Sequence, residues 1–152
     1  MKTMRNIKRQ ITFKESIKIL ENGEYGILSV VSDSKGYGIP MSYAIDKDNI
    51  YLHCANEGQK LDAINSNPNV SFSVVGKTLL IPENFTTKYE SVIIQGCAFL
   101  ADDNLKLKGL NAIIKKYSPD FIEKGNTYIQ KSFSKTTIIV LPIINISGKA
   151  SK

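Results

Sequence analysis

The chain of 152 residues contains no tryptophan, one histidine and two cysteines. Zinc sites with four protein ligands are built mainly from cysteine and histidine, so such a site would need unusual partners here. Cys54 and Cys97 lie in separate strand-like stretches rather than in a CxxC spacing. We therefore expect two buried, reduced thiols and no metal. The sequence also lacks a Ser/His/Asp order or a paired-carboxylate spacing that would indicate a hydrolase.

Arginine is scarce as well. Arg5 and Arg9 are the only arginines among 20 basic residues, and 14 acidic residues leave a net charge of +6. Nucleic-acid-binding surfaces favour clustered arginine interleaved with aromatic side chains. The lysines here are spread along the chain, which indicates a surface that attracts small anionic ligands. A nucleic-acid-binding module is therefore the third-ranked hypothesis, and it predicts steeply salt-dependent binding.

Long hydrophobic runs are absent too. No stretch of about 18 apolar residues is available to cross a bilayer. Residues 1–10 carry basic residues without the apolar segment of a signal peptide. With 42% hydrophobic residues, a chain of this length can bury a core without disulfides. We expect one cytoplasmic domain over residues 1–152, with no membrane partner.

Residues 50–75 carry the most informative pattern. Ile50, Leu52 and Cys54 alternate with polar or aromatic neighbours as in a half-buried strand. A turn-forming segment follows, and a short helix is predicted to begin near Gly58 and to end before a strand that opens at Val70.

Lys60 falls in the first turn of that predicted helix. The first turn leaves backbone N–H groups unpaired and carries positive partial charge, which suits a phosphate. A solvated lysine at an ordinary strand–helix junction is the alternative interpretation, and the local pattern alone favours this alternative.

The N-terminal part predicts a helix and a hairpin. Thr12 and Glu15 have the spacing of a capping box, which predicts a helix of about ten residues. Residues 25–32 and 38–45 read as an antiparallel hairpin. Pro40 cannot donate a ladder hydrogen bond, so we expect its strand to lie at a sheet edge or a bulge.

Periodicity and turn residues predict five further segments in the C-terminal half. They are a long loop over 76–88, a strand over 89–100 interrupted by a bulge or close approach at Gly96, a helix over 104–117 capped by Asp103, a short helix from Ser118-Pro119 to Gly125-Asn126, and a final β-rich run over 136–146 that would close the barrel.

Several motifs occur in an order that resembles the FMN-binding split-barrel family, which includes pyridoxamine 5′-phosphate oxidase, and within it the nitroimidazole-resistance (Nim-type) subgroup. They are Ile39–Tyr43, His53-Cys54-Ala55, Gly58–Leu61, Asn67–Phe72, Tyr89–Gly96 and Ile146–Lys149, after a Met-Arg start. The resemblance implies a mainly β fold with flanking helices, namely a six-stranded antiparallel split β-barrel of the FMN-binding type.

The resemblance also implies a cofactor site for FMN. The isoalloxazine and ribityl parts would be lined, largely through backbone atoms, by Pro40, Met41, Ser42 and Tyr43. The ring system would be flanked by His53, Cys54 and Ala55. The phosphate would be held by Gly58, Gln59 and Lys60. Ser91 and Lys149 would complete the set.

In this family two protomers pair and each flavin lies in their interface. The resemblance therefore implies a homodimer in which Ser91 serves the neighbour's cofactor. The loop predicted over 76–88 would either cover the substrate side of the flavin or form a variable surface loop.

The first functional hypothesis is an FMN-dependent oxidoreductase that takes electrons from NAD(P)H or another flavoprotein and reduces a small electron-poor acceptor such as a nitroimidazole. The chain has no arginine after Arg9, so turnover of a vitamin B6 phosphate is not expected. His53 is the weak candidate for acid/base catalysis, with Tyr43 or Tyr89 as alternatives, and none is assigned as essential. The second hypothesis is a non-catalytic protein that binds or senses flavin, haem or deazaflavin.

Overall fold

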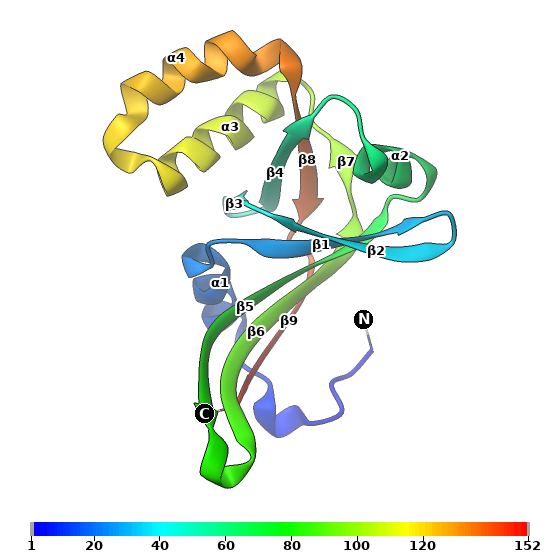
Figure 1. Ribbon diagram of the computed structural model, residues 1–152, viewed down its shortest axis with the longest axis vertical. Coiled ribbons are helices and arrows are strands. Elements are labelled where there is room, and N and C mark those ends of the chain that lie inside the picture. The colour runs from blue at the N-terminus through cyan, green and yellow to red at the C-terminus, as the bar shows by residue number, and fades with distance from the viewer. Residues whose placement is uncertain (1, 152) are drawn as a thin grey trace.

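The computed structural model describes residues 2–151, in which nine strands form two antiparallel sheets (Figure 1). The five-stranded sheet A has the order β2-β1-β5-β6-β9, and the four-stranded sheet B has the order β3-β4-β8-β7. The strands are β1 (Gly26–Ser32), β2 (Lys35–Met41), β3 (Ala44–Ile45), β4 (Asn49–Ala55), β5 (Asn69–Ile81), β6 (Thr86–Cys97), β7 (Phe99–Leu100), β8 (Thr136–Pro142) and β9 (Asn145–Ser151).

Four α-helices and four short 3₁₀ turns accompany the sheets. They are η1 (Ile7–Arg9), α1 (Phe13–Asn22), α2 (Gln59–Ser66), η2 (Pro82–Asn84), α3 (Asp103–Tyr117), η3 (Pro119–Phe121), α4 (Ile122–Ser132) and η4 (Phe133–Lys135). Within residues 2–151, none of the helices has the length and apolar character needed to traverse a bilayer.

The main core fills the space between the two sheets. Leu28 and Phe72 from sheet A and Leu52 and Leu141 from sheet B are fully buried in one cluster. A second cluster lies on the other face of sheet B, where Tyr51 packs against α3 and α4 residues such as Ile113 and Ile129. Sheet B is therefore covered on both faces. The predicted mainly β split-barrel class with flanking helices is confirmed, but the predicted count of six strands is wrong.

The burial of β4 differs from the prediction. Ile50, Tyr51 and Leu52 are all buried, so the first part of β4 is not a half-buried strand. The aromatic ring of Tyr51 lies on the face of sheet B that α3 and α4 cover. The residue pattern of a single strand does not show whether such a face is covered by helices or exposed to solvent.

An ion pair fixes α3 to the turn that precedes β4. Lys108 Nζ lies 2.9 Å from Asp46 Oδ2, and the Tyr51 hydroxyl donates to the same carboxylate. Burial acts to raise the pKa of Asp46, but hydrogen bonds from Tyr51 and Lys108 outweigh it and lower that pKa to about 2.

The long loop predicted over 76–88 is wrong. Strands β5 and β6 continue through this stretch, pair up to Ile81↔Thr86, and form the arm that extends at the bottom of Figure 1. Leu79 and Leu80 are both exposed, so neither face of the arm has the alternating burial that predicts strands. The β-bulge lies between Val75 and Thr78 in β5, whereas Gly96 pairs regularly with Val70 and makes a close approach to Leu141.

Two predicted helix boundaries are also wrong. Asp102, not Asp103, caps α3, because its side chain accepts a hydrogen bond from the Leu105 N–H. Helix α4 continues through Gly125 to Ser132. A Cβ at Gly125 would lie 2.5 Å from the Ile114 side chain, so this glycine permits close helix packing instead of ending the helix. The capping box of Thr12 and Glu15 at the start of α1 is confirmed.

The final β-rich run is divided between the two sheets. Strand β8 pairs with β4 in sheet B, and after residues 143–144 strand β9 pairs with β6 in sheet A. The β-rich run predicted over 136–146 is therefore confirmed, and the chain changes sheets within it.

The hairpin predicted over 25–32 and 38–45 is confirmed in part. Its second strand, β2, begins at Lys35 and ends at Met41, and Ala44–Ile45 form β3 of the other sheet. The two-residue turn lies at Asp33 (φ 49°) and Ser34 (φ 60°). Two positive φ values match the type I′ turn, where glycine is favoured at the second position. We expect Ser34→Gly to raise the free energy of unfolding by about 0.5–1 kcal/mol. Glycine removes the strain of a left-handed backbone conformation, and this gain is larger than the cost of the greater conformational entropy that glycine gives to the unfolded chain. Thermal unfolding measures the net change.

The control for that turn is Ser134→Gly, an exposed position without positive φ in η4. We expect it to be neutral or slightly destabilising. A melting temperature for Ser34→Gly that is no higher than that of Ser134→Gly would contradict the strain at the turn.

Candidate functional site

The loop from β4 into α2 presents an anion-binding geometry. Gly58 has φ 139°, a conformation that disfavours other residues, and a Cβ there would meet nothing within 4 Å. Its carbonyl accepts from the N–H groups of Leu61 and Asp62, which begins the helix. The N–H groups of Gln59 and Lys60 precede the first helical bond and are available to a ligand. The predicted position of Lys60 in the first turn is confirmed.

Side-chain hydrogen bonds fix this loop to both sheets. Asn56 Nδ2 donates to the Ser134 carbonyl and Asn56 Oδ1 accepts from Thr137 Oγ1, each at 2.8 Å. Gln59 Nε2 donates to Ser32 Oγ at 3.2 Å. The loop is thus attached to β1 of sheet A and to β8 of sheet B, so its backbone amides have a defined direction.

The end of β4 lies next to Lys60. Burial raises the pKa of the Cys54 thiol, and the nearby Lys60 ammonium acts in the opposite direction. His53 and Ala55 are exposed on the same strand end. The expected buried state holds in part for Cys54, whereas Cys97 is exposed, and both thiols are free. Lys60 is itself partly buried and lies outside the ion pair identified within residues 2–151.

Strand β2 forms one edge of sheet A, and its partner β1 carries the Ser32 that binds Gln59. It pairs only with β1, which confirms the edge position predicted from Pro40. Pro40 and Ser42 are exposed, whereas Met41 is buried in the core. The structure therefore leaves one side of the β2 backbone without a strand partner.

Tyr43 differs from its neighbours because its side chain is fully buried and donates a 2.6 Å hydrogen bond to the Leu20 carbonyl. Its own N–H and C=O both lie 3.0 Å from the Tyr117 hydroxyl, which also contacts the Glu24 carbonyl. Burial raises the pKa of Tyr43, and the charge of Tyr117 adds to this effect. Tyr43 is thus a structural residue beneath the β2 edge, unsuited to proton transfer. The role of Tyr117 was not predicted, since 74 positions separate it from Tyr43.

Lys116 packs over this tyrosine pair. Its Nζ lies 3.7 Å from the Tyr43 ring centroid and is buried without a hydrogen-bond partner among residues 2–151. Burial lowers the pKa of Lys116 from 10.5 to about 8. The unfolded chain therefore keeps a proton that the folded chain loses, and stability should rise as the pH rises from about 8 to 10.5.

We expect Lys116→Met to increase the free energy of unfolding at pH 7 by about 1–2 kcal/mol, after allowance for partial solvent screening and the lost cation–π contact. The rise in stability between pH 8 and 10 should disappear in this variant. Urea unfolding over that pH range measures both effects. Lys115→Met, at the exposed neighbouring position, is the control and should keep the wild-type pH dependence.

Ser91 and Lys149 lie elsewhere on sheet A. They are directly paired between β6 and β9, and both are partly buried. Pro40 aligns across the sheet with Ile27, Ser73 and Ile93, so Ser91 projects from the same face two residues further along β6. Strands β1 and β5 separate β2 from β6, which amounts to about 14 Å at the usual strand spacing.

The N-terminus of α2 thus lies beside the end of β1 and the end of β4, whereas Ser91 and Lys149 lie on β6 and β9, which β1 and β5 separate from the β2 edge. Within the described residues, no group of three or more His, Cys, Asp and Glu side chains is arranged to hold a metal ion.

The sequence profile of the pyridoxamine 5′-phosphate oxidase family matches residues 13–150. The chain belongs to this family. The match includes both parts of the site described above and all nine strands except the last residue of β9. No curated protein is similar enough in sequence to count as a relative.

Members of known structure share the fold at low sequence identity. A candidate 5-nitroimidazole antibiotic resistance protein from Bacteroides thetaiotaomicron has a TM-score of 0.79 at 20% identity, over 94% of this chain and 90% of that one. The flavocytochrome Anf3 from Azotobacter vinelandii has 0.83 at 20% identity, over 99% and 72%. An FAD- and haem-binding protein from Mycobacterium smegmatis has 0.75 at 19% identity, over 95% and 74%. These similarities establish the family's fold.

Proposed function

We propose that the protein is an FMN-dependent oxidoreductase of the Nim type that reduces a small electron-poor acceptor such as a nitroimidazole. The observation that supports this most is the N-terminus of α2, where Lys60 and two free amides lie beside the end of β4. A phosphate fits there, because Gly58 leaves open space and no ion pair of Lys60 competes within residues 2–151. FAD- and haem-binding proteins with this fold agree with a flavin ligand.

Each residue group would have a separate task. Gln59 and Lys60 bind the phosphate through their amides and the Lys60 ammonium. Pro40 and Ser42 place the unpaired side of the β2 backbone against the flavin ring. The exposed His53 would contact the ligand at the rim of the site. When bound, FMN supplies the electron-transfer chemistry, and these residues orient it and shield it from water.

We further propose a homodimer in which Ser91 and Lys149 face the cofactor of the neighbouring protomer. The separation of these two residues from the β2 edge supports this arrangement, because the other ten residues of the predicted set lie on or next to β2, β4 and α2. Exposed apolar residues on the same sheet face, Val75 and Ile93, fit a covered surface. Sedimentation tests it, and a monomer that binds FMN stoichiometrically would contradict it.

The central test is a titration of the purified protein with FMN, followed by anaerobic addition of NADPH or NADH. We expect a bound-flavin absorption band that bleaches with the reductant and returns when a 5-nitroimidazole is added. A protein that binds FMN but is not reduced by either nucleotide or by a partner flavoprotein would be a binder instead of an oxidoreductase. A protein that takes up no FMN would rule out the proposed function.

The second candidate function is a non-catalytic flavin or haem binder or sensor. It is favoured by the exposed position of His53, the only histidine in the chain, and by the haem-binding protein of the same fold. Titration with haemin should then give an absorption change that His53→Ala abolishes. An unchanged spectrum in His53→Ala would leave the histidine without a role in haem binding.

A further inference from the structure

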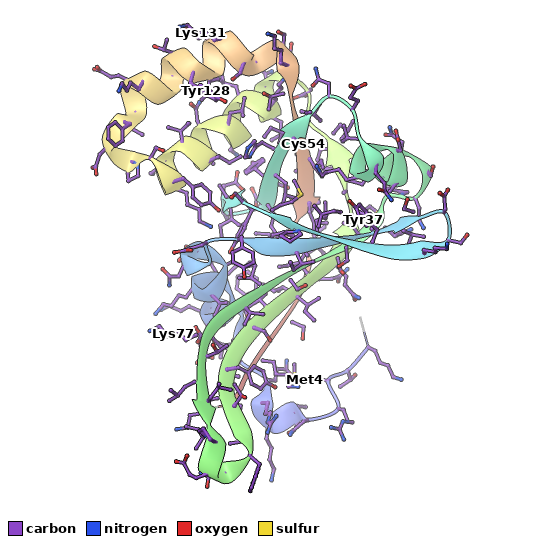
Figure 2. The ribbon with its side chains drawn as sticks, viewed as in Figure 1. Met4, Tyr37, Cys54, Lys77, Tyr128 and Lys131 are labelled. Atoms are coloured by element: carbon purple, nitrogen blue, oxygen red, sulfur yellow. The ribbon has the colours of Figure 1, made fainter. Side chains whose placement is uncertain are left out.

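A pocket of about 520 Å³ lies where the N-terminal segment meets the β5–β6 arm. We call it the arm pocket, and its principal lining residues are Arg9, Leu80, Pro82, Phe85, Thr87 and Tyr89. Figure 1 shows the blue N-terminal segment beside the lower half of the arm, at the opposite end of the molecule from α2. Figure 2 labels Met4 on this segment and Cys54 near the candidate flavin site, and the two are far apart. The arm pocket is therefore separate from the phosphate-binding loop of the same protomer.

One end of the arm pocket is polar and positively charged. Arg9 Nη1 lies 3.5 Å from the Tyr89 hydroxyl, and Lys149 Nζ lies 5.6 Å from the Tyr89 ring centroid. The ion pair identified within residues 2–151 joins Lys108 and Asp46, so neither Arg9 nor Lys149 has a carboxylate partner there. Lys149, with a smaller contribution from Arg9, lowers the pKa of Tyr89. These donors form a local excess of positive charge that an oxyanion would neutralise.

The other end is apolar and exposed. Phe85 is 98% exposed and Leu80 is 71% exposed, with Pro82 between them in sequence. Phe85 has φ 49°, a left-handed conformation that is uncommon for a bulky residue, and its ring makes no contribution to the core. A fully exposed phenylalanine held in this conformation can stack on a planar ligand.

We propose that the arm pocket binds a small aromatic carboxylate. The Arg9 guanidinium and the Tyr89 hydroxyl would receive the carboxylate, and Phe85 and Leu80 would contact the aromatic body. The positive charge of Arg9 favours this class over a neutral ligand, and the exposed apolar residues that line the same pocket favour it over an inorganic anion. The inference goes beyond the proposed redox function and does not require a flavin.

The test is calorimetric titration of the full-length protein with benzoate at low salt. Arg9→Gln should weaken binding by about tenfold or more, because a charge-assisted hydrogen bond is lost. Arg5→Gln is the matched control, since Arg5 is the other arginine, is exposed and lies outside the pocket. It should change the affinity by less than about twofold. Equal losses in both variants would overturn the proposal, because they would indicate only non-specific attraction.

A second readout follows the Tyr89 hydroxyl directly. Ionisation of Tyr89 is followed as the part of the tyrosinate absorbance change that is missing in Tyr89→Phe. This change should move to higher pH when benzoate is bound, because the carboxylate counteracts the positive charges of Arg9 and Lys149. Benzamide, which has the same ring without the charge, should cause no movement. A Tyr89 titration that benzoate leaves unchanged, or benzamide binding as tight as benzoate binding, would overturn the assignment. Inorganic phosphate is a further probe. If it bound as tightly as benzoate, and if Phe85→Ser did not change its binding, the proposed contact of Phe85 with an aromatic ligand would be wrong.

Discussion

Replacing Lys60 with alanine is expected to weaken FMN binding by about ten- to a hundredfold, the loss of one charge-assisted hydrogen bond of about 1.5–3 kcal/mol. Lys60 lies in the first turn of α2 with its backbone amide free of a helical partner. The variant keeps the amides and the macrodipole, so binding should be reduced and not abolished. Quenching of flavin fluorescence on titration measures the affinity.

Two controls separate the phosphate contact from other effects of Lys60→Ala. Lys47→Ala removes an exposed lysine from the turn before β4 and should leave FMN affinity unchanged. Riboflavin lacks the phosphate, so its weaker binding should be the same in Lys60→Ala and in the parent protein. If Lys60→Ala bound FMN as tightly as Lys47→Ala does, the phosphate would lie elsewhere. A variant that loses riboflavin and FMN equally would indicate a general disturbance of the loop.

The Gly148→Ala variant is expected to lose about 3 kcal/mol of stability, at the upper end of the usual cost of overpacking. A Cβ at Gly148 would collide with Ser16 Oγ and lie 2.6 Å from Ile11 Cγ1. Ser16 is 2% exposed and its hydroxyl donates to the Thr12 carbonyl, so the residue cannot move aside without disturbing α1. Ile11 is held by a hydrogen bond from its N–H to the Gly148 carbonyl.

Gly36→Ala is the matched control for Gly148→Ala. Gly36 also lies in a strand of sheet A, and a Cβ there would meet nothing within 4 Å. We expect this variant to stay within about 0.5 kcal/mol of the parent protein. Urea unfolding of both variants compares them directly. If Gly148→Ala were as stable as Gly36→Ala, the glycine in the C-terminal family motif would owe its place to ligand binding and not to packing against α1.

The sequence predicted those features that depend on neighbouring residues. The capping box at Thr12, the turn at Asp33, the edge position of the Pro40 strand and the first-turn position of Lys60 each follow from a few adjacent positions. The pattern of the phosphate loop was clear for the same reason, because a strand, a glycine and a helix start follow one another without interruption.

Features that depend on tertiary contacts were not predicted. The arm formed by β5 and β6 has no buried face. Its residues therefore do not alternate between apolar and polar, and the sequence does not indicate that the two strands pair there. Gly125 signals a helix end locally, but its real role is set by Ile114 of another helix. The burial of the Tyr43 side chain and the hydrogen bonds between its backbone and Tyr117 depend on segments that only the folded chain brings together. The division of the site between two regions follows from the strand order, which no local motif encodes.

The attachment of the phosphate loop to β8 has a consequence for how the protein is made. Strands β1, β2, β5 and β6 are all complete before α3 begins, and they pair with one another. Strand β4 instead pairs with β8, and the Asn56–Thr137 hydrogen bond spans 81 positions. Contacts of such long range form late in folding. On the ribosome, most of sheet A can therefore assemble before the loop around Lys60 is attached to sheet B, and the proposed phosphate site is complete only after β8 has emerged.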